Sequence, residues 1–336
     1  DELHGPVDGK PVLKYGAFSD AVYDKHGNLW ITSWGGAGVY VLNYQQKKMA
    51  LVSPVRDSIS RETYSIRCAY VDSVGYLWMG TAQNAILRIN TNNFSFASPS
   101  STNIEYLNSN SLKDPSLVFN IVFDINTNSN SQLFFCTQNG LLRYDYQSQK
   151  FSNFVKDHKS PLYNLDIRAL VFDNEKIWVG TNGAGLHLLD KNGYNINSYH
   201  VADGLPDEII YSIEKDLKGF LWMGTNKGLT RFDPRTKTGK SFTLRDGVQN
   251  YEFNTNSSLS TKGGLMVFGG IGGFNCFYPD QITGEPGTQK VIITEIKVGM
   301  NEREIADKPL QLKYDENNLS FQFSSLNFYR NEETQY

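Results

Sequence analysis

The sequence predicts an all-β fold, a β-propeller of four-stranded blades, and two observations carry that prediction. One pattern, D-x-x-G-x-L-W-x-G-T-x-x-G-L, recurs six times with 44–56 residues between equivalent positions. Apolar residues nowhere recur at helical spacing over three turns. Repeats with four strand-like runs and no helix are typical of propeller blades. A β-helix would have shorter coils, and a β-sandwich would not repeat its own sequence.

The fifth repeat shows the internal order clearly. An alternating apolar run at 211–216 suits a half-buried strand, and a D-x-x-G turn follows it. A dense strand at 220–225, a short turn, a third strand at 229–233 and a weaker fourth strand at 240–244 complete the repeat. The aspartate can accept hydrogen bonds from downstream backbone N–H groups, and the glycine can adopt a positive φ angle.

A large residue anchors the second strand of every repeat. The anchors are Trp30, Trp78, Phe134, Trp178, Trp222 and Val267. The third and sixth repeats are degenerate, because Phe134 and Val267 replace the tryptophan. We expect the four tryptophans to wedge between neighbouring blades, since a large ring excludes water over a wide area. They are therefore assigned to the core and not to a ligand cage.

The propeller domain is expected at residues 10–279. Its repeats lie near residues 20–43, 67–90, 118–145, 167–190, 210–233 and 253–278. The sixth repeat has no evident fourth strand, and we expect a strand at 11–15 to close the ring against it, since closure removes exposed edges. Six repeats are visible, and a seven-bladed ring remains open as an alternative.

A second domain is expected after the propeller. Residues 280–289 form a linker that contains glycine and proline. Residues 290–336 alternate like strands but lack the repeat pattern, and they predict the N-terminal part of an immunoglobulin-like β-sandwich. Three or four strands fit in this stretch, whereas a complete domain has about seven.

Composition limits the classes of partner and cofactor. A formal net charge of −3 over 336 residues gives no electrostatic argument for binding to nucleic acid or to an anionic membrane. No apolar run approaches the roughly 20 residues of a membrane-spanning helix. Cys68, Cys136 and Cys276 lack CxxC spacing, and we expect all three to be buried apolar side chains. We therefore expect no metal, no cofactor, no nucleic acid and no membrane contact.

Two sets of residues carry a family resemblance. The pattern D-x-x-G-x-L-W-x-G-T-x-x-G-L-x-x-[FY]-D is clearest in the fourth and fifth repeats, and the loops D-G-L-P-D at 203–207 and D-G-V-Q-N at 246–250 precede the fifth and sixth. Together they resemble the two-component regulator propeller repeat. The segment E-N-N-L-S-F-Q-F-S-S-L-N-F-Y, in the tail from about Val291, resembles the start of the sandwich domain that follows such propellers.

The resemblance implies a sensor. Such proteins are hybrid two-component systems, common in gut Bacteroidetes, with two propellers, usually seven-bladed, and a sandwich domain in the periplasm. A membrane helix, a histidine kinase, a receiver and a DNA-binding domain follow, and the ligands are often oligosaccharides. This sequence shows six repeats instead of fourteen and stops inside the sandwich. The resemblance thus implies a periplasmic fragment whose partners are an oligosaccharide, the rest of the ectodomain and, through the sandwich, a second copy in a homodimer.

The search for catalytic chemistry gives little. No G-x-S-x-G, H-E-x-x-H or Walker-type loop is present, and the five histidines have no ligand spacing. The D-x-x-G turns resemble the Asp-box of sialidases, but the serine is mostly absent and we interpret them as turns. A glycosidase needs two carboxylates about 5–10 Å apart. Glu62, Asp207, Glu208 and Glu252 lie in candidate face loops, and nothing in their spacing brings two of them together.

Binding residues are expected on one face of the ring. Loops that join the second and third strands lie on the same face as loops that join consecutive repeats, and functional residues concentrate on such loops. Aromatic rings flanked by Asn, Asp and Arg suit a sugar. The candidate ligand-binding residues are Trp34, Arg61, Tyr64, Tyr163, Asn164, Asp207, Glu208, Asn250, Tyr251 and Glu252. Trp34, which lies outside the anchor positions, and Tyr251 are the strongest candidates.

The leading hypothesis is a non-catalytic sensing module that recognises an oligosaccharide and signals through the sandwich to a membrane-bound kinase. Two alternatives remain. One is a propeller enzyme, a glycoside hydrolase or polysaccharide lyase, and the other is a scaffold whose ligand contacts another part of the sensor.

Overall fold

The computed structural model is almost entirely β-structure. It describes residues 17–54, 63–129, 131–155, 160, 162–282, 291–299, 301–303, 311–314 and 316–325. The helical segments among these residues are the 3₁₀ turns η1 (Thr91–Asn93), η2 (Pro99–Ser101), η3 (Val201–Asp203), η4 (Leu244–Asp246) and η5 (Pro279–Gln281). In this described part no helix has the length and apolar character to cross a bilayer. The predicted all-β class is confirmed.

The chain divides into two compact units, Asp1–Pro279 and Asp280–Tyr336. The described residues of the first unit form six antiparallel sheets, named blades 1 to 6 in chain order. Blade 1 consists of β1 (Ala17–Tyr23), β2 (Leu29–Trp34), β3 (Val39–Asn43) and β4 (Lys48–Val52). Blade 2 consists of β5 (Ile66–Val71), β6 (Tyr76–Thr81), β7 (Ile86–Asn90) and β8 (Ile104–Leu107). Blade 3 consists of β9 (Val122–Ser129), β10 (Gln132–Thr137), β11 (Gly140–Asp145) and β12 (Lys150–Asn153). Blade 4 consists of β13 (Ile167–Asp173), β14 (Lys176–Thr181), β15 (Leu186–Asp190) and β16 (Asn195–Tyr199). Blade 5 consists of β17 (Ile210–Lys215), β18 (Leu221–Thr225), β19 (Gly228–Asp233) and β20 (Thr238–Phe242). Blade 6 consists of β21 (Phe253–Ser260), β22 (Met266–Gly270) and β23 (Gly273–Phe277).

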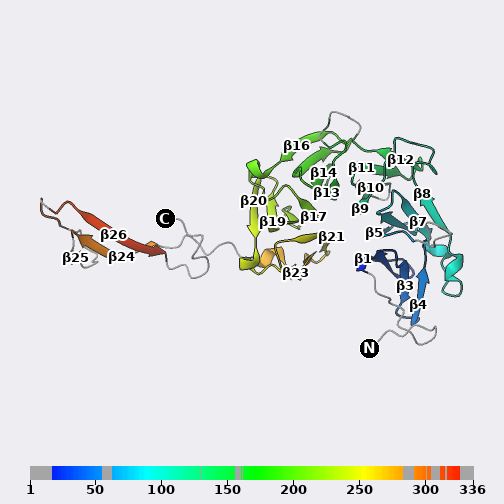
Figure 1. Ribbon diagram of the computed structural model, residues 1–336, viewed down its shortest axis with the longest axis horizontal. Helices are drawn as coiled ribbons and strands as arrows, with labels where there is room; N and C mark the ends of the chain where they lie inside the picture. Colours follow the sequence, from blue (N-terminus) through cyan, green and yellow to red (C-terminus); the bar gives the residue numbers. More distant parts are fainter. Residues whose placement is uncertain are drawn as a thin grey trace. The chain divides into compact units, whose positions relative to one another are not determined.

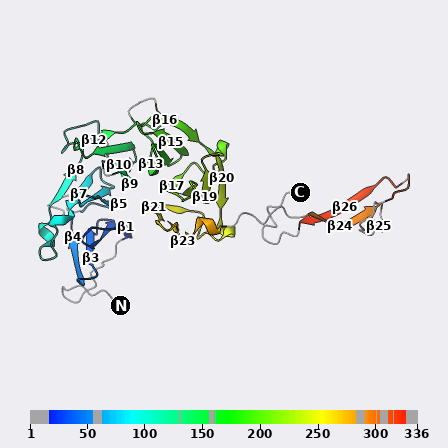
Figure 2. The same ribbon diagram turned by 180° about the vertical axis from the view of Figure 1, so that it is seen from behind.

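The blades are arranged around a common centre, as in a propeller. The first strand of each blade is innermost and contacts the first strand of the next, in the order β1, β5, β9, β13, β17, β21 (Figures 1 and 2). Within each blade the strands follow chain order from the centre outward. Blade 6 has three described strands, as its sequence predicted. The closing strand expected at 11–15 lies outside the described residues, so ring closure stays a prediction.

The second unit contains one described sheet. It consists of β24 (Val291–Val298), β25 (Asn301–Arg303) and β26 (Leu319–Ser325), in the order β25-β24-β26. Both strand pairs are antiparallel. The expected linker falls largely outside the described residues, and the immunoglobulin-like sandwich stays a prediction.

One aspartate in the first turn of a blade holds both that turn and the tryptophan anchor. In blade 5, Asp216 Oδ1 accepts hydrogen bonds from the backbone N–H groups of Lys218 and Phe220, both at 2.9 Å. Its other oxygen accepts the indole Nε1–H of Trp222 at 3.0 Å. The carboxylate and the indole ring are both buried. The D-x-x-G-x-L-W pattern therefore encodes a connection between a surface turn and a residue of the core.

The same indole bond recurs in the first two blades but not in the fourth. It joins Asp24 to Trp30 at 2.9 Å and Asp72 to Trp78 at 2.8 Å. The turn of blade 4 is one residue shorter, and its Asp173 accepts Lys215 Nζ at 2.7 Å instead. The indole nitrogen of Trp178 is buried and has no hydrogen-bond partner among the described residues. A comparison of blade 4 with blade 5 can therefore measure how much this hydrogen bond contributes to stability.

The anchors wedge between consecutive blades, which confirms their assignment to the core. Trp30, Trp78 and Trp222 are fully buried, and Trp178 is 3% exposed. Trp178 packs in one cluster with Leu221 and Met223 of the next blade. Four such clusters join the outgoing face of one sheet to the incoming face of the next, from blades 1 and 2 to blades 4 and 5, so each of the first four blades depends on its successor for burial.

Blade 6 has an outgoing apolar face with no cover among the described residues. Phe274 is 69% exposed, and Leu259 is 56% exposed on the innermost strand of the same blade. In the strand register, Phe274 occupies a position that the other five blades fill with apolar residues, each no more than 2% exposed. Those equivalents are Val39, Ile86, Leu141, Leu186 and Leu229. Cys276, expected to be buried, is exposed, because it lies on this uncovered blade.

Replacing Asp216 by alanine should lower the free energy of unfolding by about 2–4 kcal/mol, because a buried indole N–H and two turn N–H groups lose their acceptor. The matched change Asp173→Ala should cost less than about 1 kcal/mol, since it removes a partly exposed ion pair and Trp178 already lacks a partner. Urea unfolding of both variants measures the difference. Equal losses would contradict the role of the indole bond.

A second pair of variants tests the uncovered face. Leu229→Ala should cost about 2–5 kcal/mol, as for a filled core position. Phe274→Ala should change the free energy of unfolding by less than about 0.5 kcal/mol, because its ring is largely solvated. Thermal and urea unfolding provide both values, and a loss for Phe274→Ala as large as that for Leu229→Ala would show that this face is buried in solution.

Candidate ligand-binding site

A β-bulge occurs at the same place on the innermost strand of five blades. In blade 2, Ile66 pairs with Thr81 and Cys68 with Gly80, so Arg67 is the extra residue between them. The equivalent extra residues are Ser19, Phe123, Arg168 and Tyr211. In blade 6 the register shift is longer and spans residues 254–257. Bulges redirect side chains and are frequent beside functional sites.

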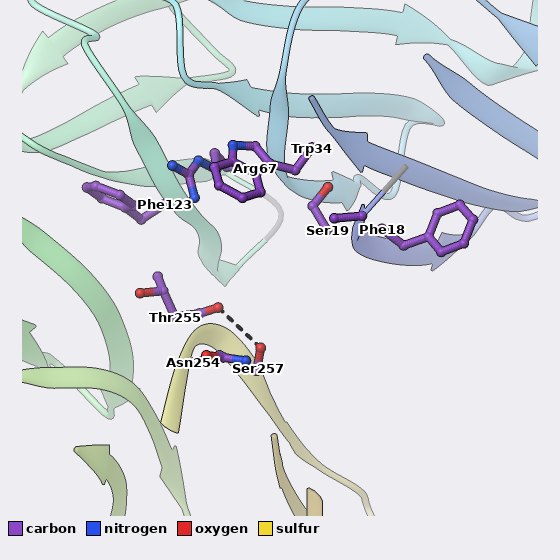
Figure 3. Close-up of a pocket in the computed structure, with 9 residues that line it drawn as sticks. Phe18, Ser19, Trp34, Arg67, Phe123, Asn254, Thr255 and Ser257 are labelled. Atoms are coloured by element: carbon purple, nitrogen blue, oxygen red, sulfur yellow. Dashed lines mark hydrogen bonds between the residues drawn. The ribbon is translucent and has the colours of Figure 1, made fainter. Parts of the chain in front are cut away.

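Several of these residues line one pocket. The pocket has a volume of about 170 Å³ and is lined by Ala17, Phe18, Ser19, Trp34, Arg67, Phe123, Asn254, Thr255 and Ser257. Figure 3 shows Arg67, Trp34 and Phe123 along one side and Asn254, Thr255 and Ser257 on the opposite side. Its walls thus come from the first three blades and from blade 6. We call this hollow the axial pocket.

Arg67 supplies a positive charge to the axial pocket. The guanidinium carbon lies 4.6 Å from the centre of the Trp34 ring, a cation–π contact. Its Nε atom is buried and has no hydrogen-bond partner among the described residues. Burial lowers the pKa of Arg67, and the nearby positive charge of Arg168 lowers it further. The group still carries its charge at neutral pH, since an arginine pKa starts far above that range.

Arg168 flanks the pocket and is already paired. Its Nε and Nη2 atoms donate to the two oxygens of Asp166 at 2.6 and 2.8 Å. Its guanidinium carbon lies 3.9 Å from the centre of the Phe123 ring, and Nη1 donates to Thr255 Oγ1 at 3.4 Å. This arginine therefore fixes two pocket walls, from blades 3 and 6, in relation to each other.

Three carboxylates lie along the innermost strands next to the bulges. Asp20 Oδ2 accepts a backbone N–H of Ala69 at 2.8 Å and the amide of Asn256 at 3.0 Å, which connects blade 1 to blades 2 and 6. Burial raises the pKa of Asp20 and of Glu214. Burial, together with the charges of Asp20 and Glu214, raises the pKa of Asp124 to about 7.

The ten predicted binding residues do not form one cluster with the axial pocket. Of those that the structure describes, Trp34 lines the pocket and is 48% exposed. Arg61 lies outside the described residues. Tyr64 is buried against the ring of Tyr106, with 5.7 Å between the ring centres. Tyr163 is half-buried and Asn164 exposed in the connection between blades 3 and 4.

The remaining predicted residues lie in the two connections that flank blade 5. Glu208 accepts the backbone N–H of Val201 at 2.8 Å and contacts His200 Nδ1 at 3.1 Å, so it stabilises its own loop. Asp207 Oδ1 accepts the backbone N–H of Ile209 at 3.3 Å. The set Asn250, Tyr251 and Glu252 immediately precedes β21, whose residues 254–257 enter the pocket wall. Their role in binding stays a prediction.

Sequence reasoning missed the bulged residues. Arg67, Phe123 and Thr255 lie inside strands, where alternation assigns each side chain to a sheet face. A signal was present, because Arg67 and Arg168 follow the same isoleucine in the aligned repeats. That alignment locates an equivalent position but does not reveal that an extra residue there faces the axis.

The fold and the site define a β-propeller with a polar and aromatic pocket at one end of its innermost strands. No protein-family model matches the chain. Among curated proteins, the histidine kinase P4 from Formosa agariphila is 30% identical over 161 residues, which cover 44% of this chain and 11% of that protein. The chain is therefore similar to a small part of a histidine kinase.

Solved structures with a similar fold include extracellular domains of two-component systems. The extracellular domain of the hybrid two-component system BT3049 from B. thetaiotaomicron has a TM-score of 0.56 at 20% identity, covering 95% of this chain and 48% of that chain. The corresponding domain of BT4673 from the same organism has a TM-score of 0.54 at 17% identity, covering 82% and 44%. The chain spans about half the length of these extracellular domains.

The fold is also shared with an enzyme. Virginiamycin B lyase from Staphylococcus aureus has a TM-score of 0.56 at 13% identity, covering 81% of this chain and 87% of that chain. At such identities the likeness concerns the fold alone, so the function depends on the residues of the site.

The raised pKa of Asp124 predicts a pH-dependent stability. An unfolded aspartate has a pKa of about 3.9. Between about pH 4 and 7 the folded state therefore holds more protons, and stability falls as the pH rises through this window. Asp124→Asn should remove that loss and make the protein about 1–2 kcal/mol more stable than wild type at pH 8. This gain is smaller than the full difference between the folded and unfolded pKa values implies, because Asp124 keeps some accessible surface.

Urea unfolding at pH 5 and pH 8 checks this prediction. The control Asp114→Asn alters an exposed carboxylate whose pKa is lowered by Ser116, so its contribution is lost only at more acidic pH. An unchanged difference between pH 5 and pH 8 in Asp124→Asn would show that another group titrates in this range.

Proposed function

We propose that this chain is a non-catalytic sensing module of a hybrid two-component system and that it recognises an oligosaccharide in the periplasm. The observation that carries the proposal is the axial pocket, where the half-exposed ring of Trp34 faces Asn254, Thr255 and Ser257. An aromatic face accommodates the C–H groups of a sugar, while amide and hydroxyl groups pair with its hydroxyls. The similarity to extracellular domains of two-component systems supports the sensing role.

The size of the pocket limits what it holds. A volume of about 170 Å³ is below the roughly 300–1,000 Å³ of sites that enclose drug-sized ligands. We infer that one sugar residue enters the axial pocket while the rest of the oligosaccharide lies over the loops of the same face. We assign contact with that outer part to Tyr251, which is 46% exposed in the connection before β21.

Signalling would follow from a difference in affinity between two arrangements of the sensor. A ligand shifts an equilibrium only as far as it binds one state better than the other. The proposed partners are the rest of the ectodomain and, through the C-terminal sandwich, a second copy and a membrane-bound kinase. The pocket is suited to such coupling because its walls come from the first three blades and the last.

An enzyme acting on polysaccharide is the rival function. It is favoured by the shared fold of virginiamycin B lyase and by Asp124, whose pKa of about 7 suits proton transfer near neutral pH. Burial also raises the pKa of the neighbouring Glu214. Incubation with a panel of glycans separates the two proposals. New reducing ends or unsaturated products would establish the enzyme, and intact glycans that bind would support the sensor.

Replacing Trp34 by alanine should weaken binding of the responding oligosaccharide at least about tenfold, or ~1.4 kcal/mol, because the aromatic platform is lost. Isothermal calorimetry with the glycan panel measures this. The control is Tyr44→Ala, an aromatic that is 90% exposed in the turn between β3 and β4. Calorimetry that stays flat on this chain, yet responds with a longer ectodomain, would instead support the scaffold alternative.

A further inference from the structure

Among the described residues Arg67 has no acidic partner, as is also true of Arg143 and Arg231, but of these three arginines only Arg67 lines the axial pocket. Arg88, Arg168 and Arg235 each contact a carboxylate, with N–O distances of 2.5, 2.6 and 3.2 Å. Among the described residues, Arg67 has no carboxylate within ion-pair distance, and its one assigned contact is the Trp34 ring. A half-buried cation without a counter-charge is costly, so its retention at the wall of a pocket calls for an anion from outside.

We propose that the axial pocket recognises the carboxylate or sulfate group of an acidic sugar, with Arg67 as the residue that selects the charge. This inference rests on the proposed function and specifies its ligand class. Arg guanidinium groups bind carboxylates and sulfates through paired, charge-assisted hydrogen bonds. Trp34 beside Arg67 covers the sugar ring that carries the acid group.

Both positive and negative groups surround Arg67. Arg168 contributes a second positive charge near Arg67, although Asp166 pairs with it. The acidic groups along the innermost strands are Asp20, which accepts hydrogen bonds from Ala69 and Asn256; Glu214, which accepts a hydrogen bond from Ser258; and Asp124, whose raised pKa leaves it partly protonated near neutral pH. An anion in the pocket would offset the repulsion between the two arginines.

The opposite wall completes the recognition. Asn254, Thr255 and Ser257 present amide and hydroxyl groups across the pocket from Arg67 (Figure 3). Thr255 Oγ1 is held by Arg168 at 3.4 Å, which orients that hydroxyl. These neutral groups can donate to an acid group or pair with ring hydroxyls, whereas Arg67 alone distinguishes a charged sugar from its neutral counterpart.

The test compares sugars that differ only in charge. Calorimetry on the full chain would use a galacturonic acid trisaccharide, its methyl ester, a galactose trisaccharide, the same trisaccharide sulfated at the primary hydroxyl, and inorganic sulfate. We expect an acidic trisaccharide to bind about tenfold or more tightly than its neutral counterpart. Arg67→Gln should abolish that preference, and Arg67→Lys should keep part of it.

Controls separate charge recognition from general effects. Arg235→Gln, on an exposed turn of blade 5, should leave the preference unchanged. Thermal unfolding verifies that each Arg67 variant is folded, and Arg67→Lys retains the positive charge if the glutamine variant is unstable. The assignment of charge selection to Arg67 is supported if the preference for the acidic sugar is lost in Arg67→Gln and is retained in Arg67→Lys and Arg235→Gln.

Five outcomes would overturn it. Equal binding of the acid and its methyl ester, or an unchanged preference in Arg67→Gln, rejects charge selection by Arg67 and leaves oligosaccharide sensing intact. Inorganic sulfate that binds as tightly as the sulfated sugar rejects recognition of the sugar. Binding of neutral glycans from the wider panel but of no acidic one rejects this inference alone, whereas no binding of any glycan rejects the proposed function with it.

Discussion

The hydrogen bond that a tryptophan indole N–H donates to a buried aspartate organises three blades of this propeller. In blade 5, one oxygen of Asp216 satisfies two turn N–H groups, and the other satisfies the N–H of Trp222. The ring can then be buried fully between two sheets without leaving an unpaired donor. In blades 1, 2 and 5, turn geometry and interblade packing are thus coupled by the same six-residue spacing between aspartate and tryptophan.

That arrangement leaves the bulged positions of the innermost strands free to vary. Other residues of these strands, such as Ile66, Ile125 and Ile213, belong to the interblade clusters, whereas the bulged residues do not. Position 67 is arginine, 123 phenylalanine, 168 arginine and 211 tyrosine at equivalent places. Equivalent positions that differ in chemistry on a conserved backbone are suited to binding, because a change there alters specificity at small cost in stability.

The fold was accessible from the sequence, whereas most of the site was not. The repeat period, the D-x-x-G turns and the buried anchors determine sheet order almost without long-range information. Trp34 was found because it is a tryptophan outside the anchor positions. Arg67 was missed because a bulge changes where one side chain points without changing the alternation around it, and Thr255 because the pocket joins blades that are nearly 200 residues apart.

Because residues distant in sequence form its walls, the axial pocket lies where the first and last blades meet. Its walls belong to the beginning and the end of the propeller, and Asn256 of blade 6 donates to Asp20 of blade 1 beside it. A ligand held by Arg67 on one side and Thr255 on the other adds a second connection between these blades. Blade 6 immediately precedes the second unit in the chain. Binding that stabilises the position of blade 6 therefore acts on the blade that leads into the C-terminal unit, which is where the proposed signalling would have to begin.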